Sequence, residues 1–203
     1  MPKKVDHDVR RQEIAAAVAR IAIDRGLQQV SFREVAAEAG MSVSLVQHYF
    51  GTKENLLIGT LEIRSAIFGQ RISRRLGALG ADARPLDRLR TVADGFLPSD
   101  RESRDAMLVY HAFAAAALTD ASLRKAAAFR NADDLMGVLA GLVAEAQDRG
   151  EVAASVDPQV SSRSLLSLVL GLSLGVLLEQ MTVQEVRSAL DAHIAQLSAT
   201  IPG

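Results

Sequence analysis

The chain has 203 residues, 49% of them hydrophobic and 23% charged, a balance typical of a soluble globular protein. It has no cysteine, which excludes disulfide bonds, and its N-terminal segment lacks the apolar core of a signal peptide, so we expect a cytoplasmic protein. Aromatic residues are scarce at 4%, alanine and leucine dominate, and no alternating strand pattern stands out. These features predict an all-α fold of about nine helices.

The charge is unevenly distributed along the chain, although the net charge is only -1. Residues 1–75 contain 12 Lys/Arg and 8 Asp/Glu, a net charge of +4. Residues 76–203 contain 11 and 16, a net charge of -5. A basic N-terminal part beside an acidic remainder is consistent with one end that faces DNA.

The first predicted helix covers residues 9–25 and ends at Gly26. Its apolar stripe has helical spacing and comprises Ile14, Ala17, Val18, Ile21 and Ala22. Lys3 and Lys4 precede it, as a disordered tail or as a basic arm that adds phosphate affinity.

Residues 31–50 predict two short helices joined by a tight turn. Ser31 and Glu34 have the spacing of a capping box, and Gly40 suits the left-handed turn that ends such a helix. Ser42 is a plausible N-cap for a second helix that runs through Phe50. Two helices so joined form a helix-turn-helix, whose second helix fits the DNA major groove. We assign the core of this motif to Phe32, Val35, Val46 and Phe50.

Particular residues of this motif resemble the TetR family of bacterial repressors. They are Gly40, Leu45, the segment HYF at 48–50, the segment TKE at 52–54, and Leu56 with Leu57. The segment VSLVQHYFGTKENLL is most similar to the branch that contains BetI-type, choline-responsive regulators. The resemblance implies a DNA-binding domain over residues 1–52 and a ligand-binding and dimerisation domain over 53–203.

By this resemblance, Val43, Ser44, Leu45 and Gln47 occupy base-contacting positions, and Tyr49 and Lys53 occupy phosphate-binding positions. Gln47 is the best direct reader, because its amide can pair with adenine. Arg33 has the reach for a guanine or a phosphate, and Ser31, Ser42 and His48 are further donors. Each has a structural alternative: the two serines as helix caps, His48 as a solvated surface residue, and Tyr49 as core.

Further helices are predicted at 52–76, 85–96, 101–118, 121–149, 158–180 and 183–199, with a loop at 77–85. Two capping boxes mark the starts of predicted helices, Ser99 with Glu102 and Thr182 with Glu185. Asp157 precedes a proline at the first position of the helix predicted at 158–180. Gly150 closes the longest helix.

Aromatic and methionine residues cluster in the middle of the chain and are candidates for a pocket that holds a small-molecule effector. They are Phe68, Phe96, Met107, Tyr110, His111, Phe113, Phe129 and Met136. The alternative is an ordinary packed core, which the same helical spacing would give.

The longest uncharged stretch, residues 164–178, is shorter than a membrane-spanning helix of roughly 20 residues, so we interpret it as a buried helix and expect no membrane association. It is apolar on nearly every face, which favours a four-helix bundle in a homodimer. The proposed interface positions are Leu165, Leu168, Leu172, Val176, Leu190, His193, Ile194 and Leu197.

Enzymatic function is not supported, because the four histidines are widely separated and no HExxH, GxSxG, P-loop or GxGxxG motif occurs. We expect neither a cofactor nor a metal. The leading hypothesis is a ligand-responsive repressor that binds a pseudo-palindromic DNA operator as a homodimer and is released by a small-molecule effector. The alternatives are an activator and a ligand-independent or architectural DNA-binding protein.

Overall fold

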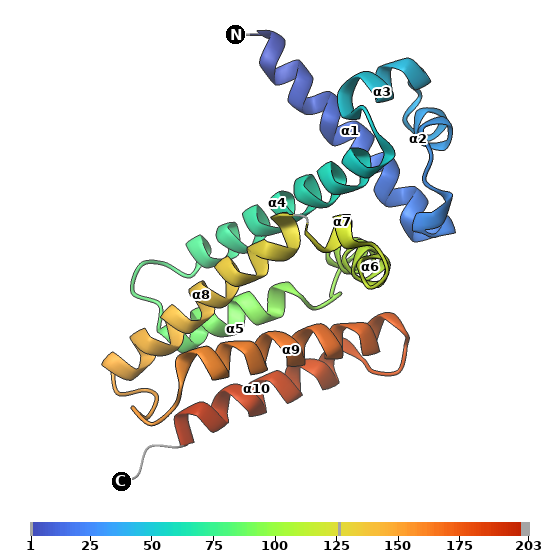
Figure 1. Cartoon of the computed structure of the whole chain (residues 1–203). Coiled ribbons are helices and arrows are strands. Elements are labelled where there is room, and N and C mark those ends of the chain that lie inside the picture. The colour runs from blue at the N-terminus through green and yellow to red at the C-terminus, as the bar shows by residue number, and fades with distance from the viewer. Residues whose placement is uncertain (1, 126, 200–203) are drawn as a thin grey trace. The chain divides into compact units, whose positions relative to one another are not determined.

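The structure, a computed structural model, describes residues 2–125 and 127–199, with side chains for 7–125 and 135–198. These residues form ten α-helices and one 3-10 helix and contain no strand (Figure 1), which confirms the all-α prediction. The elements are α1 (Pro2–Arg25), η1 (Leu27–Gln29), α2 (Phe32–Ala39), α3 (Val43–Phe50), α4 (Lys53–Ala78), α5 (Pro85–Gly95), α6 (Arg101–Ala117), α7 (Ala121–Arg124), α8 (Ala127–Asp148), α9 (Pro158–Leu177) and α10 (Val183–Ala199).

Several predicted boundaries need correction. Helix α1 begins at Pro2 rather than at residue 9, and η1 was not expected. The single helix expected over 121–149 is two helices, α7 and α8, because Lys125 ends the first of them. Residues 121–130 contain neither glycine nor proline, so no helix-breaking residue signals this break.

The predicted capping box of Ser99 with Glu102 is wrong by one residue. Helix α6 starts at Arg101, which makes Asp100 the N-cap. The backbone N–H of Ser103 donates to Asp100 Oδ1 at 2.8 Å, and the backbone N–H of Asp100 donates to Ser103 Oγ at 3.0 Å. The box of Thr182 with Glu185 is confirmed, since each backbone N–H donates to the other side chain.

The chain packs as two compact units. The first unit comprises residues 1–68 and 108–130, and the second comprises 69–107 and 131–203. The core of the first unit extends past the helix-turn-helix, because Leu57 and Leu61 of α4 and Phe113 of α6 pack with Val46 and Phe50. The predicted stripe of α1 lies in the same core. The expected domain boundary at residue 52 therefore differs from the limit of the compact packing.

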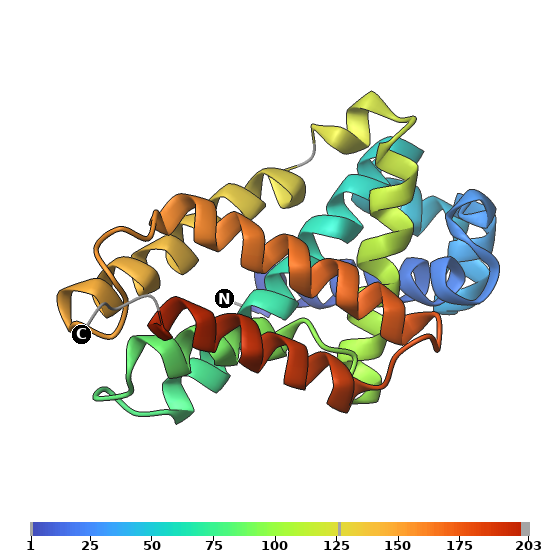
Figure 2. The same ribbon diagram turned by 90° about the horizontal axis from the view of Figure 1, so that it is seen from below.

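In the second unit, ion pairs connect helices that are distant in sequence. Arg90 of α5 donates to Asp191 of α10 at 2.6 Å, and Arg88 donates to Glu145 of α8 at 2.8 Å. Helix α9 lies beside α10, as both views show (Figures 1 and 2). These contacts fix the register of α5, α8 and α10 within this unit.

Helix α9 has 20 residues and is long and apolar enough to cross a membrane by length and composition alone. The core helix of a soluble protein meets the same criterion, and 39% of the apolar window is buried inside the chain. Four of the proposed dimer positions lie in this interior and present almost no surface to a second copy: Leu165, Val176, Leu190 and Ile194. They are corrected to core positions, because a helix that is apolar all round does not reveal which stripe faces its own core.

Candidate nucleic-acid interface

The helix-turn-helix is built from local hydrogen bonds that the sequence specifies. Ser31 Oγ accepts from the backbone N–H of Glu34 at 3.2 Å, and Ser42 Oγ accepts from that of Leu45 at 3.2 Å, so both predicted caps are confirmed. Gly40 has φ 65° and ψ 33°, the left-handed conformation that the turn requires. The backbone N–H of Met41 then donates to Ala36 O at 2.9 Å and closes the end of α2.

Helix α3 presents two different faces. Val46 and Phe50 are buried in the core of the first unit, as predicted. Ser44, Gln47 and His48 are exposed, and Val43 keeps 40% of its surface accessible. Leu45 is half-buried. The exposed surface of α3 therefore has two larger polar side chains, those of Gln47 and His48, among short or apolar ones.

Two exposed cations on the helices before and after α3 have no carboxylate partner in the described part of the chain. Arg33 of α2 and Lys53 in the first turn of α4 are exposed, and neither makes an ion pair with any residue that the structure describes. By contrast, Arg20 pairs with Glu38 at 2.6 Å and Arg25 with Glu34 at 2.7 Å. The free cations remain available for phosphate groups. Lys53 follows the cap made by Thr52 Oγ1, which accepts from the N–H of Asn55 at 3.1 Å.

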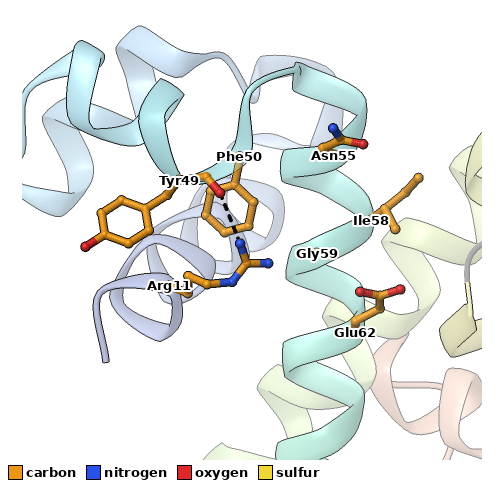
Figure 3. A pocket seen from close by; sticks show the side chains of 7 residues that line it. All are labelled: Arg11, Tyr49, Phe50, Asn55, Ile58, Gly59 and Glu62. Atoms are coloured by element: carbon orange, nitrogen blue, oxygen red, sulfur yellow. Dashed lines mark hydrogen bonds between the residues drawn. The ribbon is translucent and has the colours of Figure 1, made fainter. Parts of the chain in front are cut away.

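The C-terminal end of α3 is held by side chains of α1 (Figure 3). Arg11 Nη1 donates to the backbone oxygen of Tyr49 at 3.0 Å, and its guanidinium lies 4.5 Å from the centroid of the Phe50 ring. The Tyr49 ring is half-buried, with its centroid 4.6 Å from that of the His7 ring. Sequence reasoning missed Arg11, because its partner is a backbone atom 38 residues away.

A hollow of about 290 Å³ opens beside this contact. Figure 3 shows it between α1, the end of α3 and α4. Its lining comprises Arg11, Tyr49, Phe50, Asn55, Ile58, Gly59 and Glu62.

Two family models match the chain. The model of bacterial regulatory proteins of the tetR family matches residues 14–59, and the model of the C-terminal part of BetI-type transcriptional repressors matches residues 85–199. The chain belongs to the TetR family. It is therefore a transcriptional regulator, and the first match contains the helix-turn-helix described above.

Individual relatives agree with this assignment. The transcriptional regulator PksA of Bacillus subtilis is 27% identical over 92% of this chain and 88% of its own length. A TetR-family regulator from a Rhodococcus species has a solved structure with a TM-score of 0.85 and 26% identity, covering 93% of this chain and 98% of that one. A regulator from Saccharomonospora viridis, solved in complex with choline, shares the fold with a TM-score of 0.80 at 22% identity, covering 93% of this chain and 96% of that one.

The side chains predicted to bind the effector of this TetR-family chain fall in both compact units. In the first, Phe68, Tyr110 and His111 are partly buried, whereas Phe113 is fully buried among core residues. Burial raises the pKa of the Tyr110 phenol and lowers the pKa of the His111 imidazole. In the second unit, the buried side chains are Phe96 and Met107, and Met136 is partly buried. Phe129 lies outside the described side chains.

Helix α4 carries two polar groups that sequence reasoning missed. Thr60 is fully buried, and its Oγ1 makes no hydrogen bond to any residue that the structure describes. Arg64 lies one turn further along the helix, and its buried Nε also has no partner among the described residues. Buried polar atoms normally have a hydrogen-bond partner, so these two unsatisfied atoms are unusual. Among the described residues, no group of three or more histidine, aspartate or glutamate side chains could hold a metal ion.

Proposed function

We propose that this TetR-family regulator is a cytoplasmic repressor that binds a pseudo-palindromic DNA operator as a homodimer and is released by a small-molecule effector. The observation that supports DNA binding most directly is the exposed face of α3 flanked by the unpaired cations Arg33 and Lys53. Unpaired cations next to an exposed polar helix can bind the phosphate backbones on either side of the DNA groove that the helix enters.

In this proposal, Gln47 reads a base and the surrounding residues bind the backbone. The Gln47 amide can donate to and accept from adenine at the same time. Val43 and Leu45 contact a thymine methyl or a sugar, and Ser44 extends the reading face. Lys53 binds a phosphate with help from the free N–H groups at the start of α4. The remaining positions, Ser31, Arg33, Ser42, His48 and Tyr49, supply further donors to phosphate.

The proposed dimer forms through the outward face of α9. Val160, Leu174 and Leu178 are 60%, 39% and 57% exposed, although all three are apolar. Ser164, Ser167 and Gly171 lie between them at helical spacing and are also exposed, so two such helices can approach closely. Of the positions predicted from sequence, Leu168, Leu172, His193 and Leu197 are partly buried and stay in the proposal as its margin.

The effector is proposed to satisfy the two unpaired atoms of α4. Thr60 Oγ1 and Arg64 Nε are both donors to an incoming oxygen, and the guanidinium is positively charged. An effector with a carboxylate, phosphate or carbonyl group fits this pair better than a quaternary ammonium such as choline. Helix α4 starts directly after α3, the helix proposed to read the bases (the reading helix). An effector that favours one position of α4 therefore changes the affinity for DNA.

The experiment is a binding assay with the full-length protein. Wild-type protein selects duplexes from a random library, and the selected sequence is then tested against competitor DNA at moderate salt. A palindromic selected site supports a dimeric operator-binding regulator; binding without any sequence preference contradicts it. Thermal shifts with acetate, a long-chain fatty acid, an acyl thioester and choline then test the effector class, because a ligand that binds the native state raises the melting temperature.

The alternative of an activator, or of a DNA-binding protein without an effector, makes a different prediction in the same assay. An effector-independent protein would show no compound that both raises the melting temperature and releases the operator. An activator would keep the operator bound in the presence of the effector and would raise transcription from the adjacent promoter in a reconstituted assay.

A further inference from the structure

We propose that Arg11 of α1 is a positioning residue for operator binding, which fixes the C-terminal end of α3 through one hydrogen bond and one ring contact. This inference rests on the proposed operator binding and adds a residue that the family resemblance did not supply.

The first step of the argument is the pair of contacts that one side chain makes. Arg11 Nη1 donates to the Tyr49 carbonyl at 3.0 Å, and the guanidinium lies 4.5 Å from the Phe50 ring centroid. A planar guanidinium can donate in its plane and stack with its face, and a lysine ammonium cannot do both. Arg11 thereby holds the last two residues of α3 at once.

The second step is the close approach of α4 to both the Phe50 ring and the Arg11 guanidinium. A Cβ on Gly59 would lie 2.8 Å from Phe50 Cε1 and 3.2 Å from Arg11 Nη2. Glycine is unfavourable inside a helix, so its presence at this position is best explained by the space that the ring requires. Figure 3 shows Gly59 on the stretch of α4 that faces Phe50 and Arg11.

The third step is the space that surrounds these contacts. The hollow of about 290 Å³ borders Arg11, Tyr49 and Phe50, so packing does not enclose the end of α3 on that side. His7, one turn before Arg11 on α1, contacts the Tyr49 ring. Besides the core packing of Phe50, the orientation of α3 at this end is therefore set by the contacts of Arg11 and His7 from α1 and by the absence of a side chain at Gly59.

The consequence concerns DNA. Gln47 and Tyr49 lie in the last turn of α3, and Lys53 starts the next helix. A tilt of this end moves all three proposed DNA-contacting groups together. Arg11, whose loss would cause the tilt, need not touch DNA itself. The loss of Arg11 should therefore reduce preference for the operator more than it reduces general affinity for DNA.

The test uses full-length Arg11→Met and Arg11→Lys with the operator selected by the wild-type protein. Each variant should bind that operator roughly ten-fold more weakly, the equivalent of one lost charge-assisted hydrogen bond, and bind non-specific DNA almost as well as wild type. The slope of log affinity against log salt should stay unchanged. Arg20→Met removes a charge from the same helix and is the control, expected to leave the operator preference intact.

A direct phosphate contact gives the opposite pattern. Arg11→Lys would then restore affinity, and Arg11→Met would lower the salt slope by about one. Either that result or an unchanged operator affinity in Arg11→Met would overturn the proposal. If wild-type protein selects no sequence at all, the proposed operator binding fails first, which separates the two outcomes.

Gly59→Ala is an independent arm that leaves every charge in place. It should reproduce the loss of operator preference, whereas Gly69→Ala in the same helix should not, because a Cβ there has no neighbour within 4 Å. The double variant Arg11→Met with Gly59→Ala should lose less than the product of the two single losses, since both act on the Phe50 contact. Full additivity would contradict a shared contact. Circular dichroism and melting temperature verify that each variant is folded, and Arg11→Lys keeps the test valid if Gly59→Ala does not fold.

Discussion

The first and second units use their cationic side chains differently. In the first unit, Arg20 and Arg25 are paired with glutamates, but Arg33 and Lys53 beside the reading helix are not paired with any described residue. In the second unit, Arg88, Arg90 and Arg187 join α5, α8 and α10 through ion pairs. The ion pairs of Arg88, Arg90 and Arg187 link helices of the second unit, whereas Arg33 and Lys53 of the first unit are left available for an external anion.

Each unit has its own buried residues. The first unit has a cluster of buried apolar side chains that includes the fully buried Phe113. The second unit adds part-buried ion pairs between its helices, and each such pair contributes at most about 1 kcal/mol. A cavity in the core of the first unit should therefore reduce its stability strongly. Substitutions on its DNA-facing side should change DNA binding and leave the core intact.

The largest expected effect comes from Phe113→Ala. Removal of this fully buried ring should lower the free energy of unfolding by about 3–5 kcal/mol, because it leaves a cavity in the core of the first unit. Denaturant unfolding followed by circular dichroism measures it. Leu118→Ala is the control: this side chain is 77% exposed and should change the stability by less than about 0.5 kcal/mol. A similar small loss for both variants would contradict the described core.

The next effect concerns the reading face. Gln47→Ala should relax the preference at one base position by about 1–3 kcal/mol and leave the other positions unchanged, because one amide contacts one base pair. Binding to a set of single-base operator variants measures this. Gln29→Ala removes an exposed amide from η1, outside the motif, and should change no position. Equal weakening on every variant would show that Gln47 does not read a base.

Lys53→Ala tests the free cation and should weaken binding to all sequences by a similar factor, roughly ten-fold at low salt. The salt slope should fall by about one, since one fewer phosphate is neutralised. The matched control is Lys125→Ala, which removes an exposed lysine at the end of α7. An unchanged salt slope for Lys53→Ala would mean that this cation is free in the complex as well.

The smallest effect tests the ion-paired side of the comparison. Arg71 and the cap contacts of Ser103 hold the pKa of Asp100 at about 2, below its ordinary value of 3.8. The folded pKa is lowered, so the contribution to stability is present above about pH 4 and is lost as the pH falls towards 2. Asp100→Asn keeps a capping side chain but removes the charge that pairs with Arg71, and it should cost about 1 kcal/mol at pH 7 and almost nothing near pH 2.

Melting temperatures of wild type and Asp100→Asn between pH 2 and 7 provide the measurement. Ser99→Ala distinguishes the two possible caps, because only the residue that caps α6 should matter. If Ser99→Ala costs more than Asp100→Ala, which removes the capping oxygen, the cap lies one residue earlier.

The local features of the interface could be predicted from the sequence. Ser31, Ser42 and Thr52 bond to groups three residues away, and Gly40 satisfies a backbone angle of its own turn, so short-range spacing was sufficient to predict them. The same holds for the buried stripe of α1, since helical period alone places those residues on one face. The family resemblance then followed from the same short stretch.

Contacts between residues far apart in the chain could be identified only from the folded structure. The contact of Arg11 with Tyr49 spans 38 residues, and the contact of Phe50 with Gly59 depends on how α4 packs, so neither has a signature in a local pattern. On α9, apolar residues occur on every face, and burial alone shows that Leu165 and Val176 face the interior while Leu174 and Leu178 do not. The helical period predicts which residues share one face of a helix. The packing of other helices determines whether that face is buried or exposed.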